Sequence, residues 1–123
     1  MKERIYPIYH KGKTIYYTDW TNLLEEEEAL AAIEETTSFI ENNNEYNLLE
    51  IVDISNSYAS PTILNALKKS AKRTKPFNKK KAIVGIKGSK KILLMAVNRF
   101  IDGSIKGFES VNEAKEWLVA DKL

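Results

Sequence analysis

Short apolar runs alternate with segments of helical periodicity in this 123-residue chain, and this alternation constrains its fold more than any other feature. Residues 47–54 and 82–86 are apolar enough to be strands buried on both faces. Helical spacing is found over about 23–42, in a helix that begins at Ser60-Pro61, and over 90–101. Strands and helices that alternate in this way form parallel strand pairs joined by right-handed crossovers. We therefore expect an α/β fold.

The two ends of the chain complete the predicted order of elements. Residues 4–9 and 14–18 have strand character around a turn at Gly12, which predicts a β-hairpin, and Pro7 marks its first strand as an edge or a bulge. Residues 105–108 form a short last strand before a helix capped at Ser110. The predicted order is β-β-α-β-α-β-α-β-α, and the length suits a single domain over residues 1–123.

Local signals predict where the first two long helices begin and end. Thr21 or Asn22 can cap the first helix, and the acidic run at residues 25–28 suits its positive N-terminal end. In the second helix Ser60 is the predicted N-cap, followed by Pro61 at the first helical position.

Composition restricts the chemistry and the compartment. There is no cysteine, which excludes disulfides and thiolate sites. The first residues are polar and the apolar runs are far shorter than a bilayer span, so we expect no membrane span and a soluble cytoplasmic protein.

Charge is distributed unevenly along the chain. Residues 1–58 carry 4 basic and 12 acidic side chains, whereas residues 59–123 carry 15 basic and 5 acidic ones. Eleven Lys or Arg and no acid lie between residues 68 and 91. This run is either a solvated surface balanced in space by the acidic half or a docking surface, with Lys79, Lys80 and Lys81 as candidates, for a phosphate, a nucleic acid or an acidic protein. Nucleic acid has the least support, because only Phe77 interleaves with the basic run.

The predicted helix at residues 90–101 is apolar on almost every side, more than one buried stripe requires. Three interpretations remain: burial in the core, an interface with a second copy or another protein, and the wall of a pocket for an apolar ligand. Leu94, Met95 and Phe100 are the candidate contact residues.

Four stretches resemble STAS domains, in particular their SpoIIAA-like and SEC14-like bacterial members. Residues 81–86 are similar to the third core strand of that family, and residues 90–100 to the helix that follows it. Residues 108–118 resemble the closing strand-to-helix segment, and residues 49–55 the strand that ends in an aspartate. The resemblance implies a STAS-like mixed sheet, opened by an antiparallel hairpin and continued as βαβαβα with helices packed on the sheet. Its SEC14-like side is what suggests an apolar ligand.

The same resemblance implies a regulatory segment. STAS domains carry a phosphorylatable Ser or Thr at the start of the helix after that strand, and phosphate there changes partner binding. The matching residues here, 58–61, lack the acid and the glycine of the family pattern. The candidate switch-loop residues are Asp53, Ser57 and Ser60, and we interpret Ser60 as a helix cap.

No arrangement of residues predicts catalysis, a metal site or a cofactor. His10 is the one histidine, and we interpret it as a surface residue. Glu50 and Asp53 are three apart on a strand and therefore point to opposite faces. Glu50 indicates either a partly wet sheet face or pairing with a lysine.

We therefore expect a non-enzymatic interaction or regulatory module that binds a protein partner or itself, with a carrier of a lipid-like or other apolar molecule under residues 90–101 as the alternative. Changing Lys79, Lys80 and Lys81 to Glu is expected to weaken binding of an acidic partner and to leave stability nearly unchanged.

Overall fold

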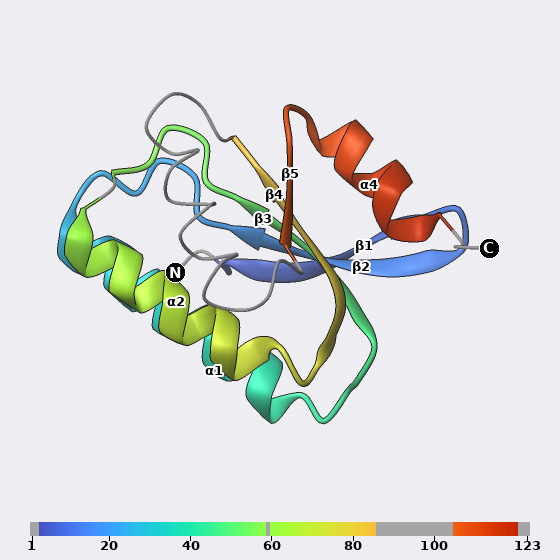
Figure 1. Cartoon of the computed structure of the whole chain (residues 1–123), viewed down its shortest axis with the longest axis horizontal. Helices are drawn as coiled ribbons and strands as arrows, with labels where there is room; N and C mark the ends of the chain where they lie inside the picture. The colour runs from blue at the N-terminus through green and yellow to red at the C-terminus, as the bar shows by residue number, and fades with distance from the viewer. Residues whose placement is uncertain (1–2, 59, 86–104, 121–123) are drawn as a thin grey trace.

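The computed structural model describes residues 3–58, 60–85 and 105–120. Figure 1 shows a twisted sheet with α1 and α2 side by side on one face and α4 on the other. The elements are β1 (Ile5–His10), β2 (Lys13–Asp19), α1 (Glu26–Asn42), β3 (Leu48–Asp53), α2 (Pro61–Thr74), β4 (Asn78–Val84), β5 (Ile105–Phe108) and α4 (Val111–Val119).

The strands are arranged in sequence order, β1-β2-β3-β4-β5. β1 is antiparallel to β2, and the other three pairs are parallel. The hairpin turn places Lys11 and Gly12 at positive φ, 49° and 79°, which matches the twist of the two strands. Pro7 lies in β1, an edge strand, where a missing N–H is tolerated. The predicted mixed sheet opened by an antiparallel hairpin is confirmed.

Each face of the sheet carries its own apolar core. Ile51 and Val84 pack with Leu118 of α4 on one face. Val52 packs with Ile33 of α1 on the other face. All six residues of β3 are buried, which confirms the prediction of a strand covered on both faces.

The predicted start of α1 was wrong. The helix begins at Glu26, and its N-cap is Glu25, whose side chain makes no capping hydrogen bond. Thr21 does not cap the helix because its N–H and hydroxyl both donate to Asp19, in a turn that follows β2. Asn22 is in the left-handed region at φ 57°, also outside the helix. The acidic first turn of α1 is confirmed.

The predicted start of β4 was also wrong, because the strand includes the lysines that precede Ala82. β4 starts at Asn78, and its register with β3 shifts by one residue. Leu48 pairs with Asn78 and Leu49 with Lys80, so Lys79 is the extra residue of a β-bulge. Three consecutive lysines are atypical of a strand, which is why the pattern favoured a loop.

Glu50 is buried, so the interpretation of a wet sheet face was wrong. Its carboxylate accepts hydrogen bonds from Thr18 Oγ1 at 2.5 Å and from Asn78 Nδ2 at 3.1 Å. Lys81 Nζ lies 3.7 Å from Glu50 Oε1. The lysine pairing is therefore the correct alternative, and the bulge at Lys79 is what brings Asn78 and Lys81 to the same carboxylate.

The apolar segment at residues 90–101, with Leu94, Met95 and Phe100, lies outside the described residues. Across the ranges that are described, no helix has the length and hydropathy needed to cross a membrane.

Candidate functional site

Two neighbouring strands end in the same local motif at their carboxyl ends. Asp19 of β2 lies opposite Asp53 of β3 in the register. Asp19 Oδ1 accepts hydrogen bonds from the N–H of Thr21 at 2.9 Å and from its hydroxyl at 2.6 Å. Asp53 Oδ1 accepts the equivalent pair from Ser55, at 3.0 and 2.6 Å. Each carboxylate thus holds the first turn of its own loop.

The other oxygen of Asp53 is also engaged. Tyr17 donates its hydroxyl proton to Asp53 Oδ2 at 2.6 Å. Burial, together with the neighbouring Asp53 carboxylate, raises the pKa of Tyr17 well above its usual range. These contacts are those of a loop-stabilising acceptor, and they occupy both oxygens of the carboxylate.

The two loops are also joined to each other. Asn22 and Asn56 both have φ 57°, and Asn56 Nδ2 donates to Asn22 Oδ1 at 2.6 Å. Sequence reasoning missed this pairing, although the signal is present as the parallel runs Asp-Trp-Thr-Asn (19–22) and Asp-Ile-Ser-Asn (53–56). Gly85, which follows β4 at φ 92°, packs so closely that a Cβ there would lie 2.5 Å from Ser55 Oγ.

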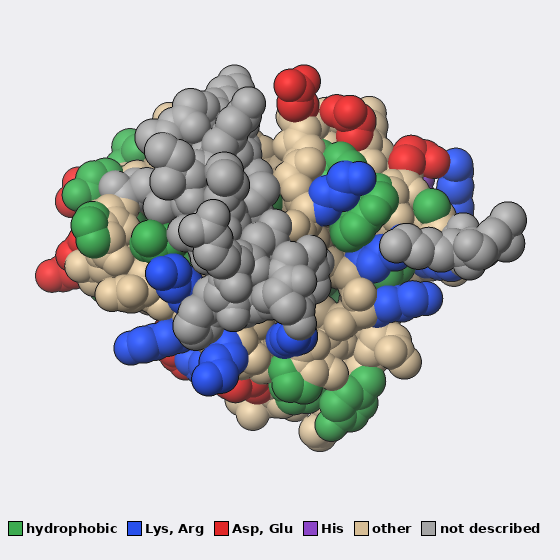
Figure 2. Space-filling view, viewed as in Figure 1, with side chains coloured by type: hydrophobic (Ala, Val, Ile, Leu, Met, Phe, Trp, Pro, Cys, Tyr) green, Lys and Arg blue, Asp and Glu red, His purple; other side chains and the backbone are tan. Residues whose placement is uncertain are grey.

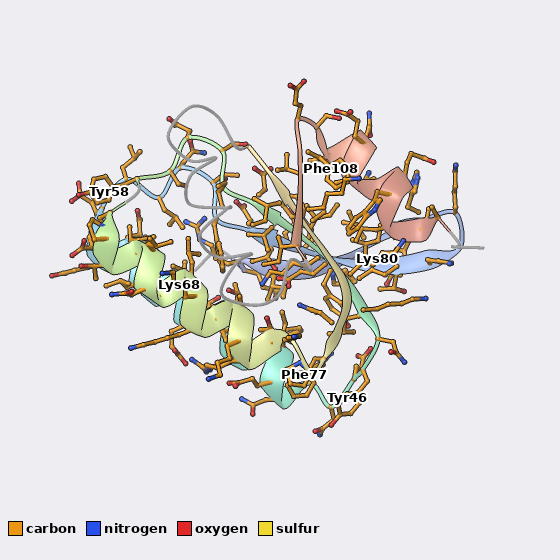
Figure 3. All side chains as sticks on the ribbon, in the orientation of Figure 1. Tyr46, Tyr58, Lys68, Phe77, Lys80 and Phe108 are labelled. Carbon is orange, nitrogen blue, oxygen red and sulfur yellow. The ribbon has the colours of Figure 1, made fainter. Side chains whose placement is uncertain are left out.

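The structure separates the three candidate lysines of β4. Lys79 is exposed at the bulge. Lys80 Nζ donates to the carbonyls of Trp117 and Ala120, at 2.8 and 3.0 Å, and lies beside α4 (Figure 3). Lys81 is buried beside Glu50. Two of the three therefore have partners within the fold, and the solvated position is Lys79.

Helices α1 and α2 carry opposite charges. α1 contains no Lys or Arg, and α2 contains no Asp or Glu. Arg73 of α2 connects them, with hydrogen bonds to Glu34 at 2.8 and 3.1 Å and to Glu41 at 2.6 and 3.0 Å. The guanidinium of Arg73 lowers the pKa of Glu34 to about 2 and also lowers the pKa of Glu41.

The remaining lysines within α2 form a basic surface. Figure 2 shows Lys and Arg side chains gathered along this helix, and Lys68 is marked on it in Figure 3. Lys69 and Lys72 are exposed, and Lys68 is half-buried. None of these three forms an ion pair with a residue in the described ranges. We call Lys68, Lys69 and Lys72 the basic α2 face.

An open cleft of about 710 Å³ lies by the amino end of β3 and is lined by Tyr9, Tyr16 and Tyr46 among others. A smaller pocket of about 250 Å³ lies beside the end of α2 and is lined by four lysines together with Thr74. Phe77, the aromatic residue within the basic run, stacks on Tyr46 with ring centroids 5.2 Å apart (Figure 3). The ring of Phe77 therefore packs against another aromatic ring of the same chain.

No protein family and no curated protein matches this sequence. A solved structure is similar in fold: that of an uncharacterised protein of the DUF3478 family from Shewanella loihica PV-4, described as having a SpoIIAA-like fold. The two share 19% identity, with a TM-score of 0.68 over 93% of this chain and 91% of that one. The chain has a SpoIIAA-like fold. At this identity the likeness concerns the STAS-like architecture and not a role.

In this STAS-like fold the predicted switch-loop serines hold the loop between β3 and α2. Ser57 Oγ donates to the carbonyl of Trp20 and accepts from the N–H of Leu23 at 3.0 Å. Ser60 Oγ accepts from the N–H of Ile63 at 3.1 Å and donates to Glu26 Oε1 at 2.9 Å. Ser60 is thus the N-cap of α2, as predicted, and also a contact to α1.

His10 joins the hairpin to α4. Its Nε2 lies 2.6 Å from Glu116 Oε2, and Lys11 Nζ donates to Glu116 Oε1 at 2.6 Å. These two neighbours, Lys11 first, lower the pKa of Glu116. Among the described residues no three His, Asp or Glu side chains are grouped so that they could hold a metal ion.

Proposed function

We propose that this chain is a non-enzymatic STAS-like interaction module that binds an acidic protein surface through the basic α2 face. The observation that carries the proposal is that Lys68, Lys69 and Lys72 lie together on one helix without an acid partner in the described ranges. Like charges held together repel each other, and an acidic partner removes that cost.

The acidic helix beside this face favours a protein over a nucleic acid. Glu34 and Glu35 are exposed on α1, next to α2. A nucleic acid presents an unbroken row of phosphates, which α1 would repel. A protein surface can present acids to α2 and basic groups to α1.

The candidate chemical residues support a non-enzymatic role. Both oxygens of Asp53 accept hydrogen bonds from the chain itself, and His10 is paired with Glu116. In such a role Asp53 holds its loop and His10 links the hairpin to α4.

The test uses two defined polyanions, a fluorescent peptide of glutamates and a single-stranded oligonucleotide of the same charge. We expect the peptide to bind in low salt, and the variant Lys68→Glu/Lys69→Glu/Lys72→Glu to lose it while its melting temperature stays close to the parent value. Lys72→Glu is matched with Lys115→Glu on α4, which changes the charge equally and should leave peptide binding unaltered. If Lys72→Glu and Lys115→Glu weaken peptide binding equally, or if the parent chain clearly prefers the oligonucleotide to the peptide, the proposal is refuted.

A further inference from the structure

We infer that the acidic surface bound by the basic α2 face is α1 of a second copy of this chain, so that two copies dock face to face through α1 and α2. The inference rests on the proposed function and names its partner. Three features of the molecule support it: the charges of the two helices, the relative positions of their residues along the helix axes, and the two-fold symmetry that these permit.

The charges of the two helices are complementary as whole surfaces. α1 exposes Glu27, Glu28, Glu34 and Glu35, and it has no basic residue. α2 carries the basic α2 face and no acidic residue. Arg73 is paired with Glu34 and Glu41 of its own chain, so it fixes α1 beside α2. The molecule therefore presents an acidic and a basic stripe on the same side of its sheet.

Contacts between the two helices show which residues of α1 and α2 are level, that is, lie at the same position along the helix axes. Glu26 bonds to Ser60, Thr37 to Ser70 and Glu41 to Arg73, pairs that are 34, 33 and 32 residues apart. The two helices are parallel, since each follows a parallel strand and precedes the next. A residue of α1 is therefore level with the α2 residue about 33 positions later, which sets Glu35 level with Lys68.

One two-fold arrangement uses this complementarity. An axis parallel to the helices, between α1 and α2, places α1 over the partner's α2 and preserves the level along the helices. Glu35 then faces the partner's Lys68, and the same contact recurs across the axis. An axis across the helices would instead stack α1 on α1, where the acids repel.

Surface ion pairs of this kind are individually weak and are screened by salt. The half-exposed ring of Phe39 on α1 adds little apolar area. We therefore expect a reversible dimer that forms at high protein concentration and dissociates as salt is raised.

The decisive experiment is a charge swap followed by sedimentation velocity. One variant is Lys68→Glu/Lys69→Glu/Lys72→Glu, and the other is Glu27→Lys/Glu28→Lys/Glu35→Lys, which leaves the Glu34–Arg73 contact in place. We expect the parent chain to dimerise in low salt, each variant alone to be monomeric, and an equal mixture to form a heterodimer, because both contacts regain opposite charges. Circular dichroism checks that both variants are folded.

A parent chain that stays monomeric at every concentration in low salt would overturn the inference, and so would a mixture without heterodimer or a dimer that persists in each variant. Binding of the glutamate peptide separates the two proposals. If the peptide binds and the dimer is missing, only the second copy is rejected. If neither forms, the proposed function fails as well.

Discussion

Replacing Lys81 with Met is expected to destabilise the fold, because it leaves the buried Glu50 carboxylate without its nearby cation. Lys81 Nζ lies 3.7 Å from Glu50 Oε1, and the Glu50 side chain is 2% exposed. Removing one partner of a buried ion pair costs about 3–5 kcal/mol. The hydrogen bonds from Thr18 and Asn78 remain, so we expect about 3 kcal/mol. For a domain of this length, that lowers the melting temperature by roughly 12 °C.

Urea unfolding followed by circular dichroism measures this loss. Lys79→Met is the matched control, because Lys79 is the exposed bulge residue two positions earlier, and its change is expected to stay within about 0.5 kcal/mol. The double variant Glu50→Gln/Lys81→Met removes both charges. The amide oxygen of the glutamine can accept from Asn78 Nδ2, and its N–H can donate to Thr18 Oγ1, so most of the lost stability should return. A loss below about 1 kcal/mol in Lys81→Met, or a double variant no more stable than that single one, would refute the reasoning.

Three further changes test other contacts. Gly85→Ala places a Cβ 2.5–2.9 Å from three atoms of Ser55 and should cost about 2–3 kcal/mol in thermal unfolding, whereas Gly12→Ala meets no atom within 4 Å and should cost clearly less. Arg73→Met should lower the free energy of unfolding by roughly 1 kcal/mol at neutral pH, a small amount because its ion pairs are exposed. This difference from the parent chain should decrease as pH falls from 4.5 toward about 2. The sign follows because Glu34 has a lowered pKa in the folded chain, so its contribution is present above the unfolded value and is lost as pH falls through the folded one; a gap that widens in acid would contradict it. In an absorbance titration at high pH, Tyr17→Phe should leave the amplitude of tyrosine ionisation unchanged, because burial and Asp53 raise the pKa of Tyr17 well above its usual value near 10.

The sequence was sufficient where local chemistry decides the structure. Gly12 in the hairpin turn, Ser60 before Pro61, and Ser110 before the closing helix each predicted an element that the structure contains. The largely apolar sequence of β3 predicted a strand covered on both faces, which follows from its position between β2 and β4.

The sequence was insufficient to predict the structure where a contact with a distant residue overrides local preference. Lys81 is accepted in a buried strand only because Glu50 of β3 lies beside it, and Thr21 is withdrawn from capping α1 because Asp19 holds it. The paired loops were visible as two similar four-residue runs, yet their significance depends on Asp19 and Asp53 being neighbours in the register.

The topology of the sheet places the acidic helix and the basic helix next to each other. β2, β3 and β4 are adjacent and parallel, so the right-handed crossovers between them place α1 and α2 on the same face of the sheet. An acidic first crossover and a basic second one must then become two adjacent stripes of opposite sign. The level of the stripes, however, depends on contacts such as that between Thr37 and Ser70, which the pattern of charges does not contain. For this reason the sequence alone leaves open whether the basic run is a solvated surface or docks an anionic partner, whereas the fold adds that this chain itself carries a matching surface.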